Sequence, residues 1–197
     1  EGAPTNIEVR ALLCVVYNEL WPYSMQDAQD IKTITIQTQQ TRTLNVVSPF
    51  GQVCEVVKLM TAGRLREAKG QVESTLEESE SFSLLPVLYS YKAELLFGES
   101  DYINAIPYFE KSIQMWGAWL QPHVALARVY MGANDHASAI AILQRVLKVN
   151  PRHKEAQVLQ GIAEFRGARN SEAAFTLLNN AFQKESPIPS TIEVEGL

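Results

Sequence analysis

The side chains best suited to chemistry in this 197-residue chain are three histidines, His123, His136 and His153. None of them has a His, Cys, Asp or Glu partner in a convincing metal-binding context. The glycine-rich phosphate loops, the GxSxG nucleophile elbow and the HExxH zinc motif are all absent from the sequence. We therefore expect a protein that is not an enzyme and that uses no metal or cofactor.

The two cysteines, Cys14 and Cys54, both stand among apolar residues. A free cysteine in such surroundings usually packs as a small hydrophobic side chain. We expect two free thiols, with a disulfide or a metal site as the alternative. Free thiols fit a reducing environment, so the expected location is intracellular, either cytoplasmic or nuclear.

The composition argues against two classes of partner. With 46% hydrophobic residues, 20% charged residues and a net charge of −5, it is typical of a folded globular protein. Binding to nucleic-acid phosphates needs clustered Lys and Arg, so we expect no nucleic-acid partner. The longest apolar run, residues 11–17, is far shorter than the roughly 20 residues of a membrane-spanning helix, so we expect no membrane partner.

Residues 125–151 contain two apolar patterns with helical spacing, a short polar break and a closing Asn-Pro. This pattern predicts a helix hairpin, and it recurs at an offset of 34 residues. The residues that coincide are Ala93, Ala127 and Gly161 in the first helix, Ala105, Ala139 and Ala173 in the second, and Phe109, Leu143 and Leu177 one turn later. A further repeat precedes these, at residues 53–76.

Each predicted turn contains Gly or Asn: "TAGRL", "FGESD", "MGAND" and "RGARN". Both residue types tolerate a positive φ and so can end the first helix of a hairpin. The small residues allow the two helices to approach closely. Because one hairpin cannot bury its apolar face alone, we expect neighbouring hairpins to stack on one another.

This pattern resembles the tetratricopeptide repeat (TPR) family, whose 34-residue hairpins carry small residues at fixed positions and a proline near the end. The third repeat matches best, with Ala127, Tyr130, Ala139 and Pro151. The resemblance implies an all-α fold, an α-α superhelix (TPR solenoid) of about four helix hairpins at residues 48–185.

Two segments lie outside the predicted solenoid. Residues 1–47 form a non-repeat N-terminal flank, for which we predict a helix followed by an extended segment at 31–47, where Ile and Thr alternate. Residues 186–197 are either a tail or the start of a further repeat, since the 34-residue frame would begin a new hairpin near residue 188.

The resemblance also implies a concave groove lined by the first helix of each repeat. The predicted partner-binding residues are Phe50, Val53, Val57, Met60, Glu94, Phe97, Val124, Arg128, Met131, Val158, Ile162 and Phe165. Family members that hold a C-terminal carboxylate place Lys and Asn at positions occupied here by Val53, Val57, Ser90 and Glu94. We therefore expect an apolar partner segment, with Arg128 and Glu94 giving polar register. The alternative is that these side chains are core, or are covered by the flank or by a second copy.

A non-enzymatic scaffold or adaptor for other proteins is the function that the resemblance implies. The first two repeats are also similar to the start of subunit 7 of the anaphase-promoting complex, through Met60, residues 61–63, Tyr91, Leu96, Phe97, Tyr102 and Tyr108. That similarity implies a homodimeric subunit of a ubiquitin ligase complex in the cell cycle. The alternatives are a small TPR chaperone that holds an unfolded partner, like those of type III secretion, and a regulatory domain cut from an enzyme.

Overall fold

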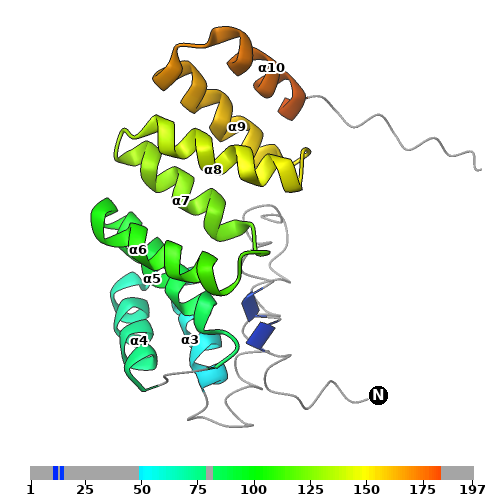
Figure 1. Cartoon of the computed structure of the whole chain (residues 1–197). Helices are drawn as coiled ribbons and strands as arrows, with labels where there is room; N and C mark the ends of the chain where they lie inside the picture. The colour runs from blue at the N-terminus through cyan, green and yellow to red at the C-terminus, as the bar shows by residue number, and fades with distance from the viewer. Residues whose placement is uncertain (1–10, 13, 16–48, 79–81, 183–197) are drawn as a thin grey trace, which may run out of the picture. The chain divides into compact units, whose positions relative to one another are not determined.

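The computed structural model describes residues 11–12, 14–15, 49–78 and 82–182, and within these ranges every regular element is helical. The elements are α3 (Pro49–Thr61), α4 (Leu65–Glu78), α5 (Leu85–Gly98), α6 (Tyr102–Met115), α7 (Gln121–Gly132), α8 (His136–Val149), α9 (Lys154–Ala163), the π-helix η1 (Glu164–Ala168) and α10 (Ser171–Phe182) (Figure 1). The described residues thus contain four consecutive helix pairs, which confirms the predicted all-α class. The predicted boundaries at residues 47 and 185 lie outside the described residues.

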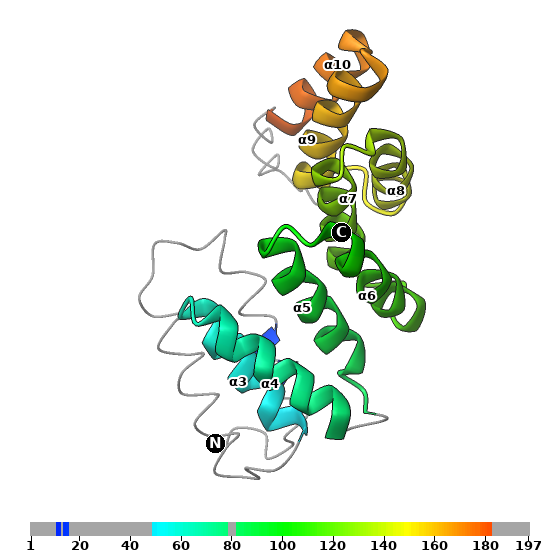
Figure 2. The same ribbon diagram turned by 90° about the vertical axis from the view of Figure 1, so that its left-hand side faces the viewer.

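Contacts divide the chain into two compact units, Glu1–Ala125 and Leu126–Leu197, with the boundary inside α7. In the N-terminal unit, α3 packs against α4, α4 against α5, and α5 against α6. In the C-terminal unit, α8 packs against α9, and α9 against α10 (Figure 2). Within each unit, these neighbouring helices in the chain are therefore also neighbours in space, as expected for stacked hairpins.

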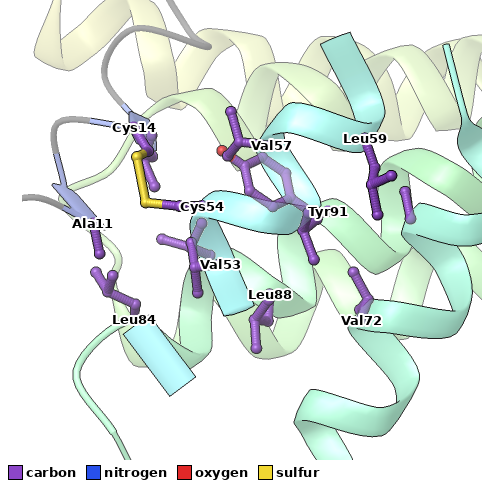
Figure 3. Packing of buried hydrophobic residues seen from close by; sticks show 14 of the residues in the cluster. Ala11, Cys14, Val53, Cys54, Val57, Leu59, Val72, Leu84, Leu88 and Tyr91 are labelled. Carbon is purple, nitrogen blue, oxygen red and sulfur yellow. A yellow bond between two sulfur atoms is a disulfide. The ribbon is translucent and has the colours of Figure 1, made fainter. Parts of the chain in front are cut away.

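The core of the N-terminal unit centres on α3 and α5. Buried side chains such as Val53, Val57 and Tyr91 meet there, together with Val72 from α4 (Figure 3). Helix α5 has buried residues on most of its circumference, because α4 and α6 both pack against it. The described flank residues, at positions 11–12 and 14–15, are helical as predicted. The predicted extended segment at 31–47 lies outside the described residues.

A disulfide joins Cys14 of the flank to Cys54 of α3, with 5.6 Å between the two Cα atoms (Figure 3). The prediction of two free thiols was therefore wrong. Both cysteines are fully buried, as expected for residues in apolar surroundings. Their separation of 40 residues gave no indication that the flank helix would pack beside α3, and only that packing brings the two sulfur atoms together.

The second helix of each pair packs the same three positions against its neighbours, and all of these residues are buried except Leu178, which is half-buried. The fourth residue is always a buried alanine, the eighth is a larger apolar residue and the eleventh is buried. The fourth residues are Ala68, Ala105, Ala139 and Ala174; the eighth are Val72, Phe109, Leu143 and Leu178; the eleventh are Thr75, Ser112, Val146 and Ala181. This spacing places one face of each second helix against its neighbours.

The last repeat is one residue longer than predicted. Asp101, Asp135 and Asn170 each cap the second helix of a pair, and their separations are 34 and 35 residues. The extra residue is accommodated by η1, because a π-helix has a wider turn than an α-helix. Ala174 and Leu178 therefore take the places that the 34-residue frame assigned to Ala173 and Leu177, and this part of the predicted alignment was wrong.

Each hairpin turn contains one residue with a positive φ, two residues before the first residue of the second helix. These residues are Gly63, Ser100, Asn134 and Arg169. The prediction that Gly or Asn would take this conformation is confirmed for the first and third turns. In the second and fourth turns Gly98 and Gly167 lie elsewhere. Gly167 is needed for a different reason, because a Cβ atom there would lie 2.4 Å from the Cβ of His136.

Candidate protein-interaction surface

Helix α9 and the first turn of η1 present a row of apolar side chains. Val158 and Ile162 are half-buried, and Phe165 is 63% exposed. Spacings of four and three residues keep the three side chains along one side of the helix. Gly161 lies on the same side of α9 and approaches α10 so closely that a Cβ atom there would lie 3.0 Å from Leu178. The row is therefore held by a rigid helix pair.

Helix α7 lies beside this row and contributes Arg128 and Met131, which are both half-buried. An ion pair connects the two helices, with 3.6 Å between Nε of Arg128 and Oε1 of Glu155. We call these six residues the α7/α9 surface: Arg128, Met131, Glu155, Val158, Ile162 and Phe165. All of them lie in the C-terminal unit. The surface combines an apolar strip with one pair of opposite charges, so it can bury an apolar segment and orient it.

Three of the predicted groove residues are core. Val53, Val57 and Val124 have no exposed surface. They cannot contact a partner without unfolding, so for these three positions the groove assignment was wrong and the alternative interpretation holds. Sequence spacing could not distinguish the two outcomes, because a groove-facing valine and a core valine occupy the same kind of apolar position on a helix.

The remaining predicted residues of the N-terminal unit are Phe50, Met60, Glu94 and Phe97, all half-buried. Phe50 packs edge-on against Phe82 at 5.7 Å between ring centroids. Phe97 contacts Tyr102 at 5.8 Å. Much of their apolar surface is therefore already used within the chain. Their role toward a partner stays a prediction.

The described histidines have structural contacts. His123 Nδ1 lies 3.1 Å from the carbonyl oxygen of Trp119, and His153 caps α9 by accepting the backbone N–H of Ala156. His136 begins α8 and lies against Gly167. No group of three His, Cys, Asp or Glu side chains within the described ranges is arranged to hold a metal ion. Among the described helices, none has the length and apolar character needed to cross a membrane.

Sequence reasoning missed two exposed aromatic residues of α10, Phe175 and Phe182, which are 72% and 75% exposed. Their spacing of seven residues places them on one face of the helix. The signal was present in the sequence, but the 34-residue frame put α10 out of register by one residue. Because of this shift, the frame did not show which residues of α10 correspond to the half-buried residues of α8.

Residues 124–186 match the family model described as "Tetratricopeptide repeat". This stretch is therefore similar to tetratricopeptide repeats. It includes the best-matching repeat of the sequence analysis and the whole α7/α9 surface. The match supports the predicted TPR resemblance, while the similarity to subunit 7 of the anaphase-promoting complex receives no support from it.

One curated relative is the "Hsp70-Hsp90 organizing protein" of Triticum aestivum, which is 28% identical to this chain over 111 residues. The aligned part covers 55% of this chain and 18% of the relative. The chain thus spans less than a fifth of the length of the curated relative that it matches.

Several solved structures share the fold at low sequence identity. YrrB, described as a TPR protein with an unusual peptide-binding site, has a TM-score of 0.60 and 14% identity, and the match covers 84% of this chain and 90% of YrrB. MamA from Desulfovibrio magneticus RS-1 has a TM-score of 0.63 and 13% identity, with 89% and 95% covered. PilF of Pseudomonas aeruginosa has a TM-score of 0.65 and 12% identity, with 89% and 79% covered. The fold is therefore an α-α superhelix of the TPR solenoid type, as predicted.

Proposed function

We propose that this chain is a non-catalytic protein-interaction module whose α7/α9 surface binds an apolar segment of a partner protein. TPR proteins mediate protein–protein interaction, and the TPR match covers this surface. The proposal therefore combines a family-level property with a specific set of residues on α7, α9 and η1.

The observation that carries the proposal is the exposure of Phe165 beside Ile162 and Val158. Complete burial of a phenylalanine side chain contributes about 1.5–3 kcal/mol, so a partner that covers this strip gains a substantial part of its binding free energy there. The adjacent Arg128–Glu155 pair offers a donor and an acceptor to the main chain or polar side chains of the bound segment. These polar groups would fix its position.

The relatives help to define the kind of partner. YrrB is described as having an unusual peptide-binding site, and by analogy we propose a peptide segment as the ligand here. The similarity to the Hsp70-Hsp90 organizing protein does not lead us to propose the C-terminal tail of a chaperone as the ligand. The positions that hold a C-terminal carboxylate in such TPR proteins are Val53, Val57, Ser90 and Glu94 in this chain, and three of them are fully buried.

The finer predictions stay open to direct tests. A place in a multi-subunit assembly such as the anaphase-promoting complex rests on the sequence similarity of the first two repeats. Homodimer formation rests on the same similarity. An intracellular location was argued from free thiols, and the disulfide between Cys14 and Cys54 removes that argument.

The proposal is tested by affinity purification with mass spectrometry, with three baits: the unmodified chain, a Met131→Glu, Phe165→Glu double variant and a Val149→Glu control. Val149 is 71% exposed on α8, so the control adds a carboxylate at an exposed apolar position outside the α7/α9 surface. We expect one set of proteins to bind the unmodified chain and the control. Their capture should fall at least about tenfold with the double variant, because two buried carboxylates would oppose binding.

Circular dichroism of all three proteins provides the folding control. If the double variant keeps its helicity and thermal midpoint while its partners are unchanged, the α7/α9 surface is not the docking site. If its thermal midpoint falls by several degrees, Met131 and Phe165 stabilise the fold and the surface is wrongly assigned.

A further inference from the structure

A second apolar surface lies on α10, on the face that carries Phe175 and Phe182. These are the fifth and twelfth residues of the helix. At 1.5 Å of rise per residue, they are about 10 Å apart along the helix axis. We call them the α10 face. It is separate from the α7/α9 surface, because no residue is common to the two.

The fifth and twelfth positions of the other second helices are half-buried. They are Lys69 and Leu76 in α4, Ile106 and Ile113 in α6, and Ile140 and Leu147 in α8. Only in α10, among these four helices, are both positions exposed. In α10, two phenylalanines are in contact with water at positions that are half-buried in the other three helices. This difference indicates that a further segment covers the α10 face.

The α8–α9 pair shows what kind of segment covers this face. Helix α9 packs against α8, and Ile140 of α8 lines a hollow together with Arg166 and Gly167 of η1. Within α9, Ala156 and Ala163 are fully buried and are seven residues apart. That spacing equals the separation of Ile140 and Leu147. A helix with small residues at this spacing matches the spacing of the large residues on a second helix.

The charges around the α10 face favour an acidic segment. Residues 126–182 contain seven Lys and Arg but only four Asp and Glu, although the chain as a whole has a net charge of −5. Arg169 is exposed at the turn that precedes α10 and Arg166 is exposed in η1, while the exposed Glu172 lies three residues before Phe175 on the same side of α10. Phe175 lies in the second turn of α10, so it is also close to the positive end of the helix dipole.

We propose that the α10 face docks an acidic amphipathic helix from a partner protein. The helix would place small or aliphatic residues, spaced by seven, against Phe175 and Phe182. In stacked hairpins, the first helices of successive pairs run parallel to one another. A docked helix that continued this arrangement would run parallel to α9, and its C-terminal turn would lie near Arg166 and Arg169. Carboxylates in that turn would then meet both guanidinium groups.

The test uses two labelled amphipathic peptides of about 18 residues, long enough to form helix in water. They share Ala and Leu at spacings of three, four and seven, and differ only in carrying Glu or Lys in the last turn. Fluorescence anisotropy measures their binding to the full chain, to a Phe175→Ser, Phe182→Ser double variant and to a Val149→Ser control. We expect the Glu peptide to bind the full chain and the control equally. Its Kd should rise at least about tenfold with the double variant, and the Lys peptide should bind several-fold more weakly.

Other results would overturn the proposal. These are binding of neither peptide, equal binding of both, or no effect of the double variant when circular dichroism shows it to be folded. A dimer of the unmodified chain that the double variant dissociates in sedimentation would instead assign the α10 face to a second copy. Binding of the Glu peptide only after removal of residues 183–197 would assign it to the chain's own C-terminal residues.

The outcome is independent of the proposed function. The Met131→Glu, Phe165→Glu variant is included in the same titrations, and it should bind the Glu peptide as the unmodified chain does. Loss of peptide binding in that variant would assign the peptide to the α7/α9 surface and would overturn the inference about α10.

Discussion

At the scale of single residues, the starts of the helices depend on short polar contacts. Asp101, Asp135 and Asn170 each accept the backbone N–H of the third following residue, at 3.4, 3.1 and 3.1 Å. His153 does the same for α9 at 3.3 Å. These contacts satisfy backbone donors that have no partner within the helix, and each fixes the residue at which a helix begins.

The cap at Asp135 makes the stability of α8 depend on pH. Hydrogen bonds from the hydroxyl and the backbone N–H of Ser138 lower the pKa of the Asp135 carboxyl below its ordinary value. A lowered pKa in the folded state means that the stabilisation is present above the ordinary pKa and is lost as the pH falls through the folded pKa. We expect Asp135→Asn to be less stable than the unmodified chain at about pH 7, and we expect this difference to be smaller at about pH 3.

Thermal unfolding followed by circular dichroism at the two pH values measures this effect. An Asn side chain can still accept the backbone N–H but does not titrate, so it isolates the contribution of the charge. An equal difference in thermal midpoint at both pH values would show that the charge of Asp135 does not stabilise α8.

At the scale of the elements, small residues determine how closely the helices approach. The fourth residue of each second helix is an alanine with almost no exposed surface. In α9, Gly161 has the same effect toward α10, where even a Cβ atom would lie within 3.0 Å of Leu178. Close-packed interiors do not tolerate added volume at such contacts.

Ala139→Leu should therefore destabilise the chain, and Ala141→Leu should not. The first residue is fully buried and the second is exposed, although both are alanines in α8. Overpacking at Ala139 should lower the free energy of unfolding by roughly 1–3 kcal/mol, whereas the exposed site should change it by less than about 0.5 kcal/mol. Urea titration of both variants gives the two values. Similar values for the two variants would contradict the register assigned to α8.

At the scale of the whole molecule, a disulfide links the flank to the first helix pair. Ala11, Cys14 and Val15 join the same core cluster as α3, α4 and α5. The described flank residues are thus part of the N-terminal unit through both apolar packing and a covalent bond. The sequence contains only these two cysteines, so the bond can be studied without competing pairings.

Reduction of this disulfide should destabilise the chain. It closes a loop of 40 residues, and the entropy of such a loop in the unfolded chain corresponds to about 4 kcal/mol, with measured values usually about 2–4 kcal/mol. Urea titration with and without a reducing agent measures the change, and alkylation with mass spectrometry counts free thiols beforehand. The Cys14→Ser, Cys54→Ser variant is the control and should not respond to the reducing agent. Alkylation of the unreduced chain would show that the thiols are free, as the sequence analysis expected.

The sequence alone determined the helical class, the hairpin repeat and the positions of most turns, because these depend on local spacing of apolar residues and on Gly or Asn near the turns. It also located the apolar row of Val158, Ile162 and Phe165. Tertiary structure decided which members of such rows are accessible: Val53, Val57 and Val124 are buried although their spacing equals that of exposed residues. It decided the register of α10, because one additional residue is absorbed by η1. It also decided the pairing of Cys14 with Cys54, since contacts between distant segments depend on packing that no local pattern records.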